Sequence, residues 1–364
     1  MSDLLAGIFF ADDQVIGSIG RPKGRNPRFL DADFEYSIKS SSNSKIPNIK
    51  FQSSSSPYND LTRMLEEFAA NVPLKNVQAI TTASLGPFDR GNSGFSNSGK
   101  IALGTRSTHW SDFNLHLKVS KAFQAMADST PHIRCLVDAE AMVLGEHYLY
   151  RKDYRDRQAK PIHGSHLIGE DTVAYLLCDE GVGGAVLRNG RLIKGDAAIE
   201  IGHMPIHSIV DDFNYNSCGA HSYPCLEGAI SLKAMRERWG ISDNEVASLP
   251  GSSPHTKRIA FYLAQAAVQI TLFYSPTVII FGGRIMDNLH IIPRIRGYYE
   301  QLARNQRTEP DKIAKGRSAL YPHYQDGYDP VQFLQSWTER DAGVLGCLCW
   351  SQLTMNSGEI LNWR

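Results

Sequence analysis

One short polar stretch, residues 200–227, constrains this chain more than any other, because it gathers two cysteines and three histidines. Cys218, His221 and Cys225 follow a C-x2-H-x3-C pattern, and His203 lies upstream of them. Two thiolates and two imidazoles form the tetrahedral ligand set of closed structural zinc sites. The spacing therefore predicts a loop that is pinned by a structural zinc ion.

The same loop carries polar groups that suit a carbohydrate. If one ring nitrogen of His203 binds zinc, the metal fixes the imidazole and leaves the other nitrogen for a substrate. His207 is an alternative fourth ligand. Glu200 and Glu227 flank the loop, and their carboxylates accept hydrogen bonds from hydroxyl groups. A rigid loop that presents such acceptors is the kind of surface that binds a sugar.

Bulk composition indicates a globular protein with a small-molecule ligand. The chain has 364 residues, of which 42% are hydrophobic, enough for two domains with sizeable cores. Lys+Arg and Asp+Glu are both 38, and this balance argues against a nucleic acid or a membrane surface as partner. No apolar stretch approaches the roughly 20 residues of a membrane span. The N-terminus lacks the basic start of a secretory signal, so we expect a cytoplasmic protein with reduced cysteines.

Strand-like and helix-like segments alternate along the chain, which predicts an α/β fold. Residues 171–195 have the pattern of a hairpin with Asn189-Gly190 at its turn, and residues 256–276 that of a long buried helix. Two segments are poor in apolar residues. Residues 37–60 suit a flexible loop or a polar hairpin, and residues 151–172 suit a surface insertion.

Asp138 ends the apolar run IRCLVD, and two roles fit it. The carboxyl ends of strands in α/β sheets face ligand crevices, where a carboxylate acts as a general base. Alternatively, Asp138 caps the helix that follows, which is the commoner role for an aspartate at such a position.

Two glycine-bearing turns are candidate nucleotide contacts. The first contains Gly181 and Gly183, and the second, after the strand-like run TVIIF, contains Gly282 and Gly283 followed by Arg284. Glycines there let a ligand, or simply another backbone, approach closely. A tight hairpin and a plain strand-to-helix turn are equally consistent with the two patterns.

Several stretches, taken together and in order, resemble the ROK sugar kinases, most closely their fructokinase-like branch. Each motif alone is weak, but their joint order is specific and spans most of the chain. The matching stretches are ASLGPFD (83–89), HWSDFNL (109–115), VDAEAMVLGE (137–146), GVGGAVLRNGRLIKG (181–195), EIGHM (200–204), CGAHSYPCLEG (218–228), SPTVIIFGGRI (275–285) and DAGVLG (341–346).

The resemblance implies an α/β protein with the actin-like ATPase (ribonuclease H-like) fold, in which two domains close on a cleft. We place the smaller, N-terminal domain at residues 1–134 plus 345–364. The larger domain, with the zinc loop and the sugar site, then spans residues 135–344. The resemblance also implies a possible homodimer, and we expect no DNA-binding helix-turn-helix of the kind that the family's repressors carry.

By the same resemblance, the chain is an ATP-dependent kinase of a hexose or hexose derivative that uses Mg²⁺. Asp138 is then the base that deprotonates the attacking sugar hydroxyl. Glu200, His203 and Glu227 hold the sugar hydroxyls, with Gly86 as a further sugar contact. The family pattern favours His203 as the fourth zinc ligand, and the two glycine turns contact the nucleotide.

The departures from the family lie on its phosphate side. Family members open with an acid-x-Gly-Gly-Thr-Lys turn, whereas this chain reads GIFFADDQV, with Asp12 and Asp13. The second phosphate turn, normally Gly-Thr-Gly, here contains Asp179 and Glu180. Like-charge contacts cost several kcal/mol against an anionic ligand, although Mg²⁺ offsets part of this. The alternative hypothesis is therefore a ROK-like protein or enzyme that keeps the sugar pocket and zinc but does not transfer phosphate.

Overall fold

The computed structural model describes most of the chain as two compact units. Unit 1 comprises Met1–Asp153, Lys194–Ala198 and Trp337–Arg364, and unit 2 comprises Tyr154–Ile193 and Ile199–Ser336. The compact units divide at other positions than the predicted domain limits after residues 134 and 344. Those limits stay a prediction. The described residues are 4–23, 33–36, 48–54, 56–89, 99–102, 110–157, 172–195, 198–209, 217–303, 332–336 and 341–356.

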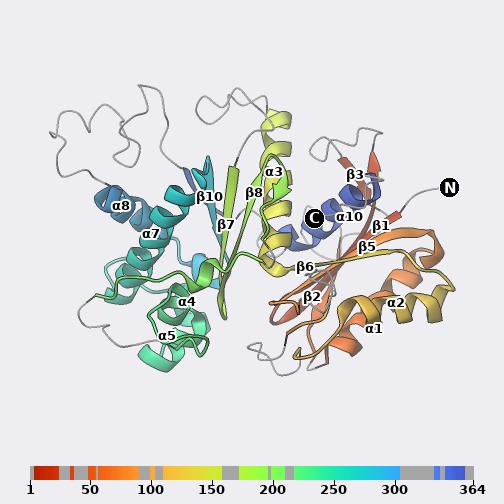
Figure 1. Cartoon of the computed structure of the whole chain (residues 1–364), viewed down its shortest axis with the longest axis horizontal. Coiled ribbons are helices and arrows are strands. Elements are labelled where there is room, and N and C mark those ends of the chain that lie inside the picture. The colour runs from red at the N-terminus through yellow and green to blue at the C-terminus, as the bar shows by residue number, and fades with distance from the viewer. Residues whose placement is uncertain are drawn as a thin grey trace. The chain divides into compact units, whose positions relative to one another are not determined.

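The described strands of unit 1 form a six-stranded sheet of order β3-β2-β1-β5-β6, with β4 also paired to β2 (Figure 1). β1 is antiparallel to β2 and parallel to β5, which is parallel to β6. Every residue of β1 is buried, as expected for a central strand covered on both faces. The strands are β1 (Leu4–Phe10), β2 (Gln14–Lys23), β3 (Asp33–Tyr36), β4 (Ile49–Gln52), β5 (Val77–Ser84) and β6 (His132–Val137).

Helices cover both faces of this sheet. Successive side chains of β1 alternate between the faces, so Ala6 and Ile8 pack into a core with α1 (Pro57–Asn71) and α2 (Leu115–Ala127). The short helix η1 (Leu74–Asn76) lies between α1 and β5 along the chain. On the other face Gly7 lies against α10 (Asp341–Asn356), where an added Cβ would come within 2.9 Å of Cys347. Glycine at this position lets the C-terminal helix lie directly on the central strand.

Unit 2 repeats the pairing pattern of unit 1. Its described strands form a five-stranded sheet of order β11-β10-β7-β8-β9. β7 is antiparallel to β8 and parallel to β10, as β1 is to β2 and β5. The predicted turn at Asn189-Gly190 joins β8 to β9, with positive φ angles at both residues. The strands are β7 (Thr172–Cys178), β8 (Val182–Arg188), β9 (Arg191–Leu192), β10 (Val278–Gly282) and β11 (Gln332–Gln335).

The helices of unit 2 enclose its larger core. The predicted long buried helix is α7, which begins after the N-cap residue Ser253 and packs beside α8 (Figure 1). None of the helices in the described part of the chain is both long enough and apolar enough to cross a membrane. The remaining elements are η3 (Ile201–His203), α4 (Leu226–Ile230), α5 (Leu232–Trp239), α6 (Asp243–Val246), α7 (Pro254–Tyr274), η5 (Arg284–Asp287) and α8 (Ile291–Ala303).

The two polar segments contain more regular structure than their composition indicates. In the first, β4 pairs with β2, and α1 begins at Pro57; residues 37–47 and 55 lie outside the described residues. In the second, residues 151–157 continue α3 (Asp138–Arg157), and residues 158–171 lie outside the described part. The prediction of a surface insertion at 151–172 is therefore wrong for its first residues, because the helix that starts at Asp138 runs on into them.

Candidate functional site

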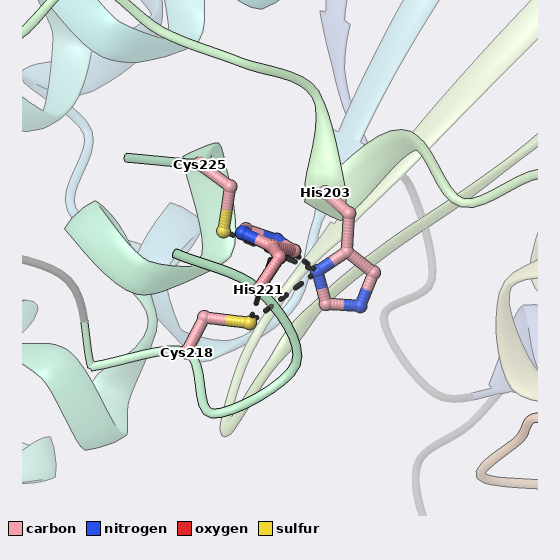
Figure 2. Close-up of side chains that lie close together, drawn as sticks. All are labelled: His203, Cys218, His221 and Cys225. Carbon is pink, nitrogen blue, oxygen red and sulfur yellow. Dashed lines mark hydrogen bonds between the residues drawn. The ribbon is translucent and has the colours of Figure 1, made fainter. Parts of the chain in front are cut away.

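Four potential metal ligands converge in unit 2, as the spacing in the sequence predicts. His203 ends the short helix η3, while Cys218, His221 and Cys225 come from the loop that leads into α4 (Figure 2). Their ligand atoms all lie within 4.8 Å of one another. Within the described residues, this is the one group of three or more His, Cys, Asp or Glu side chains arranged to hold a metal ion.

The separations between these atoms fit a tetrahedral zinc ion. The Nε2 atom of His221 and the Nδ1 atom of His203 are 3.3 Å apart. The Sγ atom of Cys218 is 3.7 Å from Nε2 of His221 and 3.5 Å from Nδ1 of His203. Cys225 Sγ is 4.0 Å from Nδ1 of His203. Zinc–ligand bonds of about 2.0–2.3 Å at tetrahedral angles separate two nitrogens by about 3.3 Å and a nitrogen from a sulfur by about 3.6 Å. The cluster is therefore compatible with zinc.

Neighbouring groups orient the ligands. The Nδ1 atom of His221 is 3.0 Å from the carbonyl oxygen of Tyr223, which can only accept a hydrogen bond. The proton therefore sits on Nδ1, and the lone pair of Nε2 points into the cluster. The Tyr223 ring stacks on that imidazole at 3.8 Å, and its hydroxyl donates to the carbonyl of His203. Sequence reasoning missed Tyr223, because its role depends on the folded loop.

The carboxylates predicted to bind sugar lie beside this cluster. The Nε2 atom of His203 faces Glu200 at 4.0 Å, while Nδ1 faces the cysteines. Burial raises the pKa of Glu200 above its ordinary value; the nearby His203 opposes this rise, and Glu227 adds to it. Glu227 accepts the backbone N–H of Val182 at 2.9 Å. Glu200 thus lies near both His203 and Glu227 within unit 2.

His207 lies outside the cluster. Its backbone N–H donates to the side chain of Gln265 at 2.8 Å, and its carbonyl accepts from the same amide at 3.0 Å. The turn that carries His203 into the cluster depends on Gly202, where an added Cβ would lie 1.7 Å from the carbonyl oxygen of Val182. The geometry therefore favours His203 over His207 as the fourth ligand.

Asp138 lies in unit 1, at the point where β6 ends and α3 begins. Its Oδ1 atom accepts the backbone N–H of Ala139 at 2.7 Å. Glu140, by contrast, accepts the N–H of Val137 and forms an ion pair with Lys194 at 2.8 Å. Glu140 therefore shares the capping role that sequence reasoning gave to Asp138. The Asp138 carboxylate stays half-buried at a strand end, where the general-base role predicted for it is possible.

The other predicted contacts are divided between the units. Gly86, in unit 1, lies against Val137: a Cβ added to Gly86 would be 2.6 Å from the Cγ1 atom of Val137. Gly181 accepts a hydrogen bond in the turn after β7, and Gly183 is paired inside the β7–β8 ladder. The space beside both remaining glycines is filled by the chain itself. A Cβ added to Gly282 would lie 2.0 Å from the hydroxyl oxygen of Tyr175. A Cβ added to Gly283 would lie 2.2 Å from the carbonyl oxygen of Cys178.

The two acidic turns differ in their surroundings. Asp12 and Asp13 are exposed at the tip of the hairpin between β1 and β2. In unit 2, Asp179 is buried and accepts from the Nε atom of Arg284 at 2.6 Å. The turn of unit 2 is thus packed into a network of charged side chains.

Comparisons with known proteins agree with this fold. A family model described as ROK family matches residues 162–320. A fructokinase of Lactococcus lactis subsp. cremoris is 25% identical over 270 residues, which cover 74% of this chain and 81% of that protein. A ROK hexokinase from Thermus thermophilus has a TM-score of 0.66 at 15% identity, covering 98% of this chain and 100% of the hexokinase.

A ROK family glucokinase from Streptomyces griseus, solved with glucose and AMPPNP, has a TM-score of 0.59, again at 15% identity. It covers 96% of this chain and 99% of the glucokinase. At such identities the solved structures establish the shared fold. The predicted actin-like ATPase fold is therefore confirmed, residues 162–320 match the ROK family model, and the chain is similar in sequence to bacterial fructokinases.

Proposed function

We propose that the chain is a fructokinase-like hexose kinase of the ROK type, whose sugar site is organised by a structural zinc ion. One observation carries the proposal. Glu200, His203 and Glu227 gather beside a four-ligand cluster whose dimensions suit zinc. In this proposal zinc, held by both histidines and both cysteines, is structural and fixes the imidazole whose Nε2 atom faces Glu200. The homology to fructokinases supports a hexose as the substrate.

In the proposed reaction, Asp138 takes the proton from the sugar hydroxyl as its oxygen attacks the γ-phosphorus of ATP. The bond between that phosphorus and the bridging oxygen breaks, and ADP leaves with the electron pair. The half-buried carboxylate at a strand end suits this role, and Glu140 shares the capping of the helix with it. ATP would arrive as its Mg²⁺ complex, in which the metal would offset part of the phosphate charge.

A second candidate is a sugar-binding ROK protein that does not transfer phosphate. The observation in its favour is Asp179, whose carboxylate already receives the guanidinium of Arg284 on the turn that corresponds to a phosphate contact in the family. Gly283, on the facing turn, touches the chain's own backbone. Both features weaken the case for nucleotide at this turn and leave the sugar-binding residues untouched.

Two measurements separate the candidates. ADP formation from ATP-Mg²⁺ would be measured with fructose, mannose and glucose, and thermal unfolding would be followed with each sugar alone. The kinase proposal expects hexose-dependent ADP formation that Asp138→Asn abolishes while stabilisation by sugar persists. Stabilisation by a sugar without ADP formation would favour the second candidate. A chain that no hexose stabilises and that forms no ADP would exclude both.

A further inference from the structure

The turn after β7 holds a carboxylate in an unusual environment. Asp179 is 8% exposed, and its Oδ1 atom accepts the backbone N–H of Glu180 at 2.8 Å. The same atom accepts Nε of Arg284 at 2.6 Å, and Oδ2 accepts the backbone N–H of Arg284 at 3.2 Å. One carboxylate thus receives two backbone N–H groups and a guanidinium, the set of donors that binds anionic ligands elsewhere in proteins.

This turn lies where α/β sheets receive ligands. β7 and β10 are neighbouring parallel strands, so their carboxyl ends emerge side by side. Gly283, which follows β10, has a φ of 90° and lies so close to the carbonyl of Cys178 that a Cβ would be 2.2 Å from its oxygen. The two strand-end turns therefore touch each other, and Asp179 is the anion held by the N–H groups there.

An outer ring of charges surrounds Asp179. Asp243, at the start of α6, accepts Nη1 of Arg284 at 2.9 Å and Nη1 of Arg236 at 2.6 Å. Arg236, on α5, also pairs with Glu180. The five groups comprise three carboxylates and two guanidiniums, so they leave one excess negative charge facing any approaching anion.

We propose that Asp179 is an internal anion that occupies the anion-binding position of this strand end and so excludes polyphosphate groups from unit 2. A ligand phosphate would have to displace the carboxylate from the N–H groups of Glu180 and Arg284 and from the guanidinium. It would also meet the one excess negative charge of the five groups, and like-charge contacts strongly disfavour binding. The inference therefore supports the second candidate function over the kinase, because ATP carries such a polyphosphate group, and it holds whether or not a sugar binds beside the cysteine–histidine cluster.

Removing the carboxylate should uncover the site. Asp179→Ala leaves the guanidinium of Arg284 and two backbone N–H groups without their anion and removes the excess negative charge. Hydrogen bonds to charged groups are strong enough that tripolyphosphate should bind roughly tenfold to hundredfold more tightly than to the wild-type chain. The gain should shrink as salt is added, because the interaction is electrostatic.

The experiment is calorimetric titration of the full chain with inorganic tripolyphosphate, without sugar or nucleotide. Glu237→Ala is the matched control, because it removes the same charge from an exposed position on α5. Asp179→Ala should bind the probe and Glu237→Ala should behave as wild type. Adding Arg284→Gln to Asp179→Ala should abolish the gain. Asp179→Ser, which also vacates the position and removes the charge, carries the same test should the alanine variant fail to fold.

Two results would overturn the inference. One is a folded Asp179 variant, judged by circular dichroism, that binds tripolyphosphate no better than the wild-type chain. The other is a wild-type chain that already binds the probe as tightly as Asp179→Ala. Neither result affects stabilisation by hexoses, so a failure here is distinguishable from a failure of the proposed sugar site.

Discussion

Replacing Gly145 by alanine should destabilise unit 1, because α3 and α10 meet there at backbone distance. A Cβ on Gly145 would lie 1.8 Å from the carbonyl oxygen of Ala342. The contact is reciprocal, since a Cβ on Gly346 would lie 1.8 Å from the carbonyl oxygen of Ala141. The obstacle in both cases is backbone of a packed helix, which cannot rotate away as a flexible side chain can.

The size of the effect follows from two opposing terms. To reach a separation that real Cβ atoms tolerate, the helices must move apart by roughly 1.2 Å, and overpacking of this kind costs about 1–3 kcal/mol or more. Alanine recovers about 1 kcal/mol through its higher helix propensity. We expect Gly145→Ala to lower the free energy of unfolding by about 1–2 kcal/mol, which is roughly 2–8 °C in Tm for a unit of this size.

Urea denaturation followed by circular dichroism measures this loss. Gly297→Ala is the matched control, because Gly297 also lies inside a helix, α8, and an added Cβ would have nothing within 4 Å. That variant should gain about 0.5–1 kcal/mol from helix propensity alone. If Gly145→Ala is as stable as Gly297→Ala, the close approach of α3 to α10 is refuted.

Three further predictions concern the cysteines and histidines. His203→Ala should reduce the zinc content of the purified chain well below one ion, whereas His207→Ala should keep it at one; equal losses in elemental analysis would contradict the choice of ligand. Burial raises the pKa of Cys135 to about 11, so this thiol should not react with a disulfide reagent at pH 8 until urea unfolds the chain. The unfolded thiol releases its proton near the ordinary pKa of 9.0, whereas the native thiol keeps it. The contribution of Cys135 to stability should therefore fall as the pH rises from 9 toward 11. Urea midpoints measured at each pH would show this fall.

The parts of the fold that sequence predicted well depend on local patterns. The apolar run of β1 (Leu4–Phe10), the Asn189-Gly190 turn and the long helix α7 are each set by residues within one segment. Hairpin chemistry and helical periodicity act over a few residues, so they can be read without the rest of the chain. The continuation of α3 past residue 150 was missed, because its charged composition resembles that of a loop.

The candidate site divides along the same line. Three of the ligands, Cys218, His221 and Cys225, lie within eight consecutive residues, and their spacing alone predicts a metal site. The partners of Asp179 did not follow from spacing, since Arg284 is 105 positions away along the chain. Such pairs are set by the packing of whole elements, and a single sequence carries no local signal for them.

The two acidic turns differ in how strongly they argue against nucleotide binding. Sequence alone treats both acidic turns alike, because each simply gains carboxylates. In the structure, Asp12 and Asp13 are exposed at a hairpin tip, where solvent screens their charge and a divalent cation can reach them. Asp179 is instead held by backbone N–H groups and by Arg284, so it acts as a fixed ligand of its own turn. The case against nucleotide binding therefore rests on the buried turn of unit 2, and the exposed turn of unit 1 adds little to it.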